Sequence, residues 1–238
     1  MALPKLNTVK YELTVPSTGK KLKFRPFLVK EQKTLMIAQE SEDEVVIQNA
    51  LADVISACTF DKIDPWNIPS FDLEYIFLNV RGKSIGELLE ISVLCPDDME
   101  TRVPIKINLE EIEVTIDDEH TNMISLDENI KMVMKYPTLK DVTKALGEEE
   151  GVSQTEQMFK MVKMCVSEIH DGETIYSHVD ISSTDLEEFI DGMSTGHLEK
   201  VNNFFDTMPK LFHTVTVKNP NTEVESEITL QGFDDFFV

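Results

Sequence analysis

The chain has 238 residues, of which 41% are hydrophobic and 28% are charged. This length and composition are typical of a protein with a substantial core, arranged as one large domain or two modest ones. The formal net charge of -22 disfavours binding to nucleic acid, because the phosphates carry charge of the same sign.

The sequence predicts neither disulfide bonds nor a membrane anchor. Three widely spaced cysteines give no disulfide framework, and we expect them to be buried thiols. Apolar runs fall well short of the roughly 18 residues that a membrane helix needs. The first residues, MALPKLNTVKYELTVP, contain no apolar signal core, so we expect a cytoplasmic or intracellular protein.

The first expected element is a β-hairpin in a basic region. KYELTVP and KKLKFRPF alternate apolar and polar residues around STGK, where Gly19 supplies the positive φ that such a turn favours. Residues 1–35 hold eight Lys or Arg and two Glu, about +6 in total, which leaves about -28 for the rest. This basic region either docks on an acidic partner or another copy, or is a pair of solvated hairpin faces. The candidate partner-binding residues here are Lys20, Lys21, Lys23 and Arg25.

Helical patterns follow the hairpin. VVIQNALADVISACTF carries an apolar stripe at helical spacing, and SFDLEYIF at 70–77 begins like a helix, with Ser70 as N-cap and an acidic first turn. QTEQMFKMVKMCVSEIH later in the chain has a similar stripe that is rich in Met. These stripes predict helices packed into a core, although a Met-rich stripe also suits an adaptable binding groove.

The stretch VLCPDDMETRVPI, residues 93–105, has the form of a zinc knuckle that has lost a ligand. Such a knuckle reads C-P-x-C, and Asp98 stands at the second cysteine. The corresponding turn near the end of the chain, VKNPNTEVES, contains no cysteine. Because one thiolate cannot replace the usual set of about four ligands, we predict zinc-ribbon-like hairpins without metal, and no cofactor.

Similar elements recur in the same order along the chain. Three pairs of elements are similar: SFDLEYIF with STDLEEFI, the segment that contains Cys58 with the one that contains Cys165, and the hairpin around Cys95 with the last hairpin. Offsets of about 107 to 113 residues relate most of the repeated elements. We therefore predict an α+β fold of two pseudo-repeated halves, residues 1–117 and 121–238, joined by IDDEHTN. Each half would contain β-hairpins and several helices.

One catalytic motif occurs in the sequence. GMSTG at 192–196 matches G-x-S-x-G, which requires a strand-to-helix turn to expose its serine. Helical patterns flank the string on both sides, so a C-cap Gly followed by an N-cap Ser or Thr explains it. We predict no catalytic residues.

The chain ends in an aromatic cluster, LQGFDDFFV. Phe233, Phe236 and Phe237 form either the last part of the core or an exposed anchor for a partner. We expect Phe233 to be packed inside and treat Phe236 and Phe237 as interface candidates.

Several long strings together resemble the T4-type bacteriophage baseplate protein family. They are LPKLNTVKYELTVPSTGKKLKFRPFLVKEQK at the start, FDLEYIFLNVRGKSIGE at 71–87, MKYPT at 134–138 and ITLQGFDDFF near the end. The resemblance spans nearly the whole chain. Some members of that family carry Cys pairs at turns equivalent to 95–98 and 218–222, where this chain keeps only Cys95.

The resemblance implies a non-enzymatic role in assembly of the baseplate hub, as a hub subunit or as an assembly factor or chaperone. Its partners would be other hub proteins or the tape-measure protein, and it would act in the host cytoplasm, remaining in the virion baseplate if it is a subunit. The alternative is a degenerate zinc-ribbon adaptor that tethers nucleic acid or a replication partner. The strong negative charge and the missing ligands disfavour that alternative.

Overall fold

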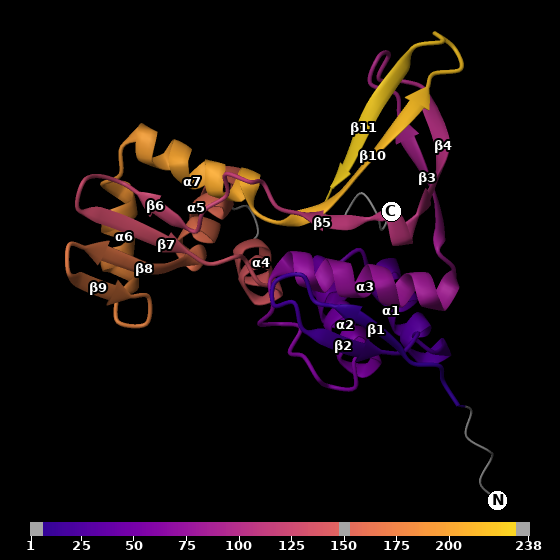
Figure 1. Cartoon of the computed structure of the whole chain (residues 1–238), viewed down its shortest axis with the longest axis horizontal. Coiled ribbons are helices and arrows are strands. Elements are labelled where there is room, and N and C mark those ends of the chain that lie inside the picture. Colours follow the sequence, from indigo (N-terminus) through magenta and orange to yellow (C-terminus); the bar gives the residue numbers. More distant parts are fainter. Residues whose placement is uncertain (1–6, 148–152, 232–238) are drawn as a thin grey trace, which may run out of the picture. The chain divides into compact units, whose positions relative to one another are not determined.

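The computed structural model describes residues 7–147 and 153–231, apart from the side chains of Leu146 and Gly147, and its architecture is α+β (Figure 1). Within these ranges the chain forms seven α-helices, and all of its strand pairs are antiparallel. The predicted α+β class is therefore confirmed. None of the helices in these ranges is both long and apolar enough to cross a lipid bilayer.

The chain forms two compact units. Unit 1 combines the residues up to Thr115 with those from Lys210 onward, and unit 2 is the intervening segment Ile116–Pro209. These units do not coincide with the halves 1–117 and 121–238, because the last hairpin of the chain pairs with a strand that ends at Thr115. The repeat of the two halves remains a prediction.

Unit 1 begins with the predicted hairpin. Strands β1 (Tyr11–Thr14) and β2 (Lys21–Phe24) pair in antiparallel fashion, and Gly19 in their turn has a φ of 64° as expected. Alternation places Leu13, Leu22 and Phe24 in the core.

Three helices follow, namely α1 (Val29–Ser41), α2 (Glu44–Cys58) and α3 (Ser70–Ile85). The side chain of Asp43 caps α2 by accepting the N–H groups of Val45 and Val46 at 2.9 and 3.2 Å. The prediction that Ser70 caps α3 is wrong, because Pro69 is the N-cap and makes no side-chain bond. The acidic residue of that first turn, Asp72, instead accepts hydrogen bonds from the backbone and hydroxyl of Ser17.

Two long hairpins complete unit 1. Strands β3 (Leu88–Leu94) and β4 (Arg102–Asn108) form one of them, and a short 3-10 helix, η1 (Leu109–Glu111), follows. Strands β10 (Lys210–Lys218) and β11 (Glu225–Gln231) form the other, which β5 (Glu113–Thr115) extends into the order β11-β10-β5. Figure 1 shows the two hairpins side by side. They share one core with α3, made of Leu78, Leu89, Val93, Ile107, Leu109, Ile112, Leu211, Val217 and Leu230.

Unit 2 contains a four-stranded sheet of order β6-β7-β8-β9. Its strands are β6 (Met123–Ser125), β7 (Ile130–Met134), β8 (Val166–Asp171) and β9 (Thr174–Ser177). Its helices are α4 (Leu139–Gly147), α5 (Gln154–Cys165), α6 (Ser183–Asp191) and α7 (Thr195–Thr207). The apolar stripe of α5 contributes Val162 and Cys165 to the core, as the sequence predicts for a packing helix.

Candidate functional site

The turns of the two long hairpins in unit 1 have equivalent backbone geometry. The N–H of Met99 donates to the carbonyl of Cys95 at 3.0 Å, and the N–H of Glu223 donates to the carbonyl of Asn219 at 2.9 Å. Met99 and Glu223 also share a positive φ, 56° and 62°, which few residues other than glycine adopt. Asn219 therefore occupies in one turn the position that Cys95 occupies in the other.

Side chains at these two turns bond to one another. The amide nitrogen of Asn219 donates to both carboxylate oxygens of Asp97 at 3.0 Å and to Oδ2 of Asp98 at 2.9 Å. The hydroxyl of Thr222 donates to Asp97 at 2.5 Å. Asn219 is only 1% exposed, and its own Oδ1 accepts the N–H of Asn221 at 2.8 Å. These charge-assisted hydrogen bonds connect the two hairpins, and we call the set the hairpin clasp.

The hydrogen bonds of the clasp favour ionised carboxylates. The pKa of Asp97 lies below its ordinary value, chiefly because the Asn219 amide donates to it. The pKa of Asp98 is also lowered, chiefly by the hydroxyl of Thr101 and then by backbone N–H groups. Both carboxylates are therefore anionic at neutral pH.

The clasp overlaps the four turn positions that correspond to zinc-knuckle ligands, since Asp98, Asn219 and Thr222 belong to both sets, whereas Cys95 makes none of the side-chain bonds of the clasp. These positions hold Cys95, Asp98, Asn219 and Thr222. Across the ranges 7–147 and 153–231, no group of three or more His, Cys, Asp or Glu is placed to hold a metal ion. Cys95 is fully buried, and burial raises the pKa of its thiol. Hydrogen bonds between side chains connect the two turns.

Three of the predicted partner-binding residues lie on an exposed face. Lys20, Lys21 and Lys23 are all exposed, and Lys21 and Lys23 share the side of β2 opposite the buried Leu22 and Phe24. Lys21 makes a 2.8 Å ion pair with Glu12, in which both side chains are well exposed. Such a pair is weak, so these lysines remain able to contact another molecule. We call Lys20, Lys21 and Lys23 the basic hairpin face.

Arg25, the fourth basic candidate, makes internal contacts instead. Its side chain is 10% exposed and forms a 2.8 Å ion pair with Glu31, which is 5% exposed. Its backbone N–H donates to the carbonyl of Cys58 at 2.9 Å, and Glu31 also accepts the N–H of Leu28 at 2.8 Å, which caps α1. Burial raises the pKa of Glu31, but the bonds from Arg25, Leu28 and Lys30 outweigh it and bring this pKa to about 2.

A similar junction occurs in unit 2. Lys135 forms a 2.9 Å ion pair with Asp141, which caps α4 by accepting the N–H of Thr138 at 3.1 Å. The backbone N–H of Lys135 donates to the carbonyl of Cys165 at 2.7 Å. In both junctions, the capping carboxylate lies six positions after the cation, and a buried cysteine supplies the carbonyl. Burial raises the pKa of Cys58 to about 11 and that of Cys165 to about 12, so neither thiol is reactive.

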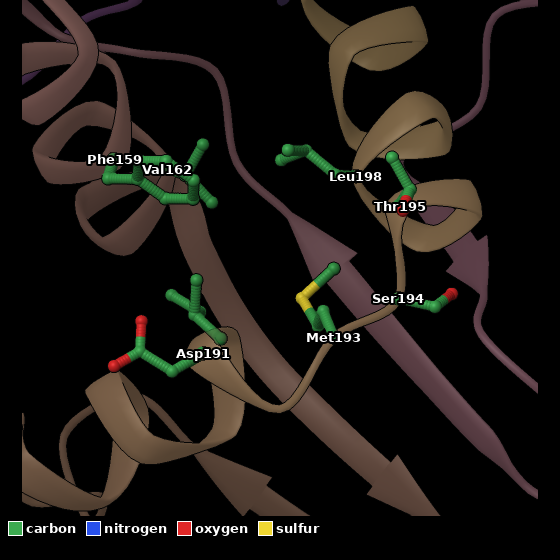
Figure 2. Close-up of a pocket in the computed structure, with 8 residues that line it drawn as sticks. Phe159, Val162, Asp191, Met193, Ser194, Thr195 and Leu198 are labelled. Carbon is green, nitrogen blue, oxygen red and sulfur yellow. The ribbon is translucent and has the colours of Figure 1, made fainter.

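The G-x-S-x-G string lies beside a small pocket in unit 2. Figure 2 shows Met193 and Leu198 pointing into this pocket of about 270 Å³, toward Phe159 and Val162, whereas Ser194 points away from it. The hydroxyl of Ser194 accepts the N–H of His197 at 3.2 Å and thereby caps α7. The serine is therefore used as a helix cap, in agreement with the prediction.

The remaining candidates, Phe233, Phe236 and Phe237, lie outside the described residues. The sequence reasoning missed the clasp and the two ion-paired junctions. A usable signal was present for each. The strings C-P-D-D and N-P-N-T mark equivalent turns, and R-P-F-L-V-K-E matches K-Y-P-T-L-K-D at an offset of 110 residues from Arg25 to Lys135.

The comparison with protein families decides the wider assignment. The model of the T4 bacteriophage base plate protein family matches residues 8–238, nearly the whole chain. The chain belongs to the T4 bacteriophage base plate protein family. This matched range includes both hairpin turns, both junctions and the basic hairpin face. Comparisons with curated proteins and with solved structures found no match. Membership in a base plate protein family implies that other baseplate proteins are its partners.

Proposed function

We propose that this base plate family protein acts in assembly of the baseplate hub through protein-protein contacts and without catalysis. The observation that carries the proposal is the family match over residues 8–238. The site chemistry agrees with it, since Ser194 caps a helix and the thiols of Cys58 and Cys165 have raised pKa values. Both a permanent hub subunit and a transient assembly factor or chaperone are consistent with these features.

The basic hairpin face is the proposed contact surface. Lys20, Lys21 and Lys23 gather positive charge on a protein whose net charge is -22. A basic surface on an acidic body attracts an acidic partner and orients it, because opposite charges steer association. The proposed partners are another hub protein or the tape-measure protein. The aromatic residues Phe233, Phe236 and Phe237 remain candidates for the apolar part of such an interface.

We also propose that the two halves of the chain arose as a repeat. The equivalent junctions at Arg25 and Lys135 support this, because each pairs a cation with a helix-capping carboxylate six residues later. The order of elements supports it as well: in each half an antiparallel strand pair precedes two helices, and a long hairpin ends the half. A repeated scaffold would present related hairpins to partners more than once.

The experiment is a phage that lacks this gene, complemented from a plasmid. We expect infected cells without the protein to accumulate tails or baseplate precursors that lack a complete hub, visible by electron microscopy. The wild-type plasmid should restore infectious particles. Normal particles in the absence of the protein would contradict the proposal.

Quantitative mass spectrometry of the complemented particles then separates the two forms of the proposal. A fixed copy number in each purified virion indicates a hub subunit. Abundance in the lysate with absence from virions indicates an assembly factor or chaperone.

A further inference from the structure

Helix α1 presents apolar side chains on the face opposite its buried side. Glu31 and Ala38 are its buried residues, whereas Val29 is 81% exposed, Met36 55% and Ile37 54%. At about 100° per residue, Val29 and Met36 point almost directly away from Ala38. Single exposed apolar residues are ordinary, but three lie on one side of this 13-residue helix, and we call this side the strip.

Charged residues are placed along the same strip. Lys33 follows Val29 by four residues and Glu40 follows Met36 by four, so the order along the strip is apolar, basic, apolar, acidic. These side chains, with Gln32 and Ile37, line one shallow surface groove. Neither Lys33 nor Glu40 makes an ion pair with any residue in the described ranges, so both charges can pair with another molecule.

The charge along this helix is polarised. Lys30 and Lys33 lie in its first half, where the buried Glu31 pairs with Lys30 at 3.2 Å, and Glu40 lies near its end. Further acidic residues follow in the turn and at the start of α2, namely Glu42, Asp43 and Glu44. A surface that is basic at one end and acidic at the other is complementary to itself when a second copy is reversed.

We propose that α1 is a self-association surface, which pairs in antiparallel orientation with α1 of a second copy of this chain. With the two-fold axis between Met36 and Ile37, Met36 of each copy faces Ile37 of the other. Lys33 of each copy then faces Glu40 of the other, which gives two symmetric ion pairs around an apolar centre. Parallel packing would place Lys33 against Lys33, which repels.

The expected association is reversible and concentration-dependent. A helix of 13 residues is about 20 Å long, so a pair of such helices buries less than the roughly 1,600 Å² of a standard stable interface. The net charge of -22 also opposes association, and this long-range repulsion is screened at about 0.15 M salt. We therefore expect a dissociation constant between about 1 and 100 µM.

The test is sedimentation velocity on the full-length protein over a concentration series at about 0.15 M salt. Wild type should shift from monomer to dimer within that range. The double variant Met36→Glu/Ile37→Glu should weaken dimerisation at least tenfold. The matched control Ile175→Glu/Val179→Glu alters two exposed residues of unit 2, 59% and 86% exposed, and should dimerise as wild type does.

Exchanging the charges of Lys33 and Glu40 tests the antiparallel orientation, and it alters no buried residue. Lys33→Glu alone and Glu40→Lys alone should each weaken the dimer, because each creates two like-charge contacts. The double variant Lys33→Glu/Glu40→Lys should restore it.

Three results would overturn the proposal. A wild-type monomer throughout the series would rule out self-association through the strip. A dimer that tolerates the Met36 and Ile37 changes would place the interface elsewhere. Failure of the charge exchange to restore the dimer would exclude this antiparallel pairing.

Discussion

The junctions at Arg25 and Lys135 use the same hydrogen bonds in different surroundings. In each, the carboxylate that caps the next helix also binds the cation that directly follows the preceding strand. At the first junction the ion-pair side chains of Arg25 and Glu31 are 10% and 5% exposed. At the second, those of Lys135 and Asp141 are 43% and 12% exposed.

This difference separates the role of geometry from that of burial. Both carboxylates accept a backbone N–H at a helix start, so the contribution from capping should be similar. Only in the Arg25–Glu31 pair are both side chains removed from water. When one partner of such a buried pair is deleted, the other charge is left with neither solvent nor a partner. The two junctions should thus respond very differently to the same substitution.

The largest expected effect is that of Glu31→Ala, which leaves the Arg25 guanidinium buried without its anion. We expect a loss of about 3–5 kcal/mol in the free energy of unfolding, measured by urea denaturation. Asp141→Ala is the matched variant, and its loss should be about 1–2 kcal/mol because Lys135 reaches solvent. Equal losses at the two positions would contradict the role given to burial.

Acid should weaken the first junction through Glu31. Its folded-state pKa of about 2 lies below its ordinary value of 4.5, so ionised Glu31 stabilises the folded protein. That stability is complete above about pH 4.5 and is lost as the pH falls toward 2, by up to about 3 kcal/mol. Urea denaturation at several pH values measures this slope. In Glu31→Gln the free energy of unfolding should fall less steeply between pH 4.5 and 2. An unchanged slope would show that groups other than Glu31 cause the loss of stability in acid.

The hairpin clasp should be of intermediate importance. Asn219→Ala removes the amide that donates to Asp97 and Asp98, and we expect a loss of about 1–3 kcal/mol in thermal or urea unfolding. Asn221→Ala is the control, because the single bond from Asn221 to the hydroxyl of Thr101 is exposed, and its loss should stay below about 1 kcal/mol. A smaller loss for Asn219→Ala than for Asn221→Ala would show that the clasp does not hold the hairpins together.

Lys135→Ala should have the smallest effect. Its side chain is 43% exposed, so water can solvate Asp141 when the pair is removed, and the loss should be at most about 1 kcal/mol. Calorimetry or urea denaturation can distinguish this small loss from that of Arg25→Ala, for which we expect a loss of several kcal/mol in the free energy of unfolding. A loss as large as that of Arg25→Ala would mean that Lys135 is effectively buried.

Local sequence patterns predicted the elements that depend on short-range chemistry. Alternation and Gly19 predicted the first hairpin, and the apolar stripe around Val162 predicted a packed α5. The string around Ser194 was correctly interpreted as a helix cap, because the patterns on both sides were helical. The buried state of all three cysteines was also confirmed.

Long-range pairing was not predictable in the same way. Asn219 and Asp97 are separated by 122 residues. The strings C-P-D-D and N-P-N-T mark the two turns as equivalent, but they do not say which side chains meet across them. Arg25 was grouped with the exposed lysines because its charge was visible in the sequence, whereas its burial depends on how α1 and α2 pack around it. The compact units likewise depend on the pairing of β10 with β5, which joins distant parts of the chain.

The most direct test of the proposed function is affinity capture from infected cells, with the recovered baseplate proteins quantified by mass spectrometry. The test variant carries Lys20→Glu, Lys21→Glu and Lys23→Glu. The control carries Lys131→Glu, Lys140→Glu and Lys144→Glu, three exposed lysines of unit 2, so that both variants have the same net charge. We predict that wild type and control recover hub or tape-measure proteins and that the test variant loses at least nine-tenths of them. Equal recovery by the two variants would contradict a function carried by the basic hairpin face.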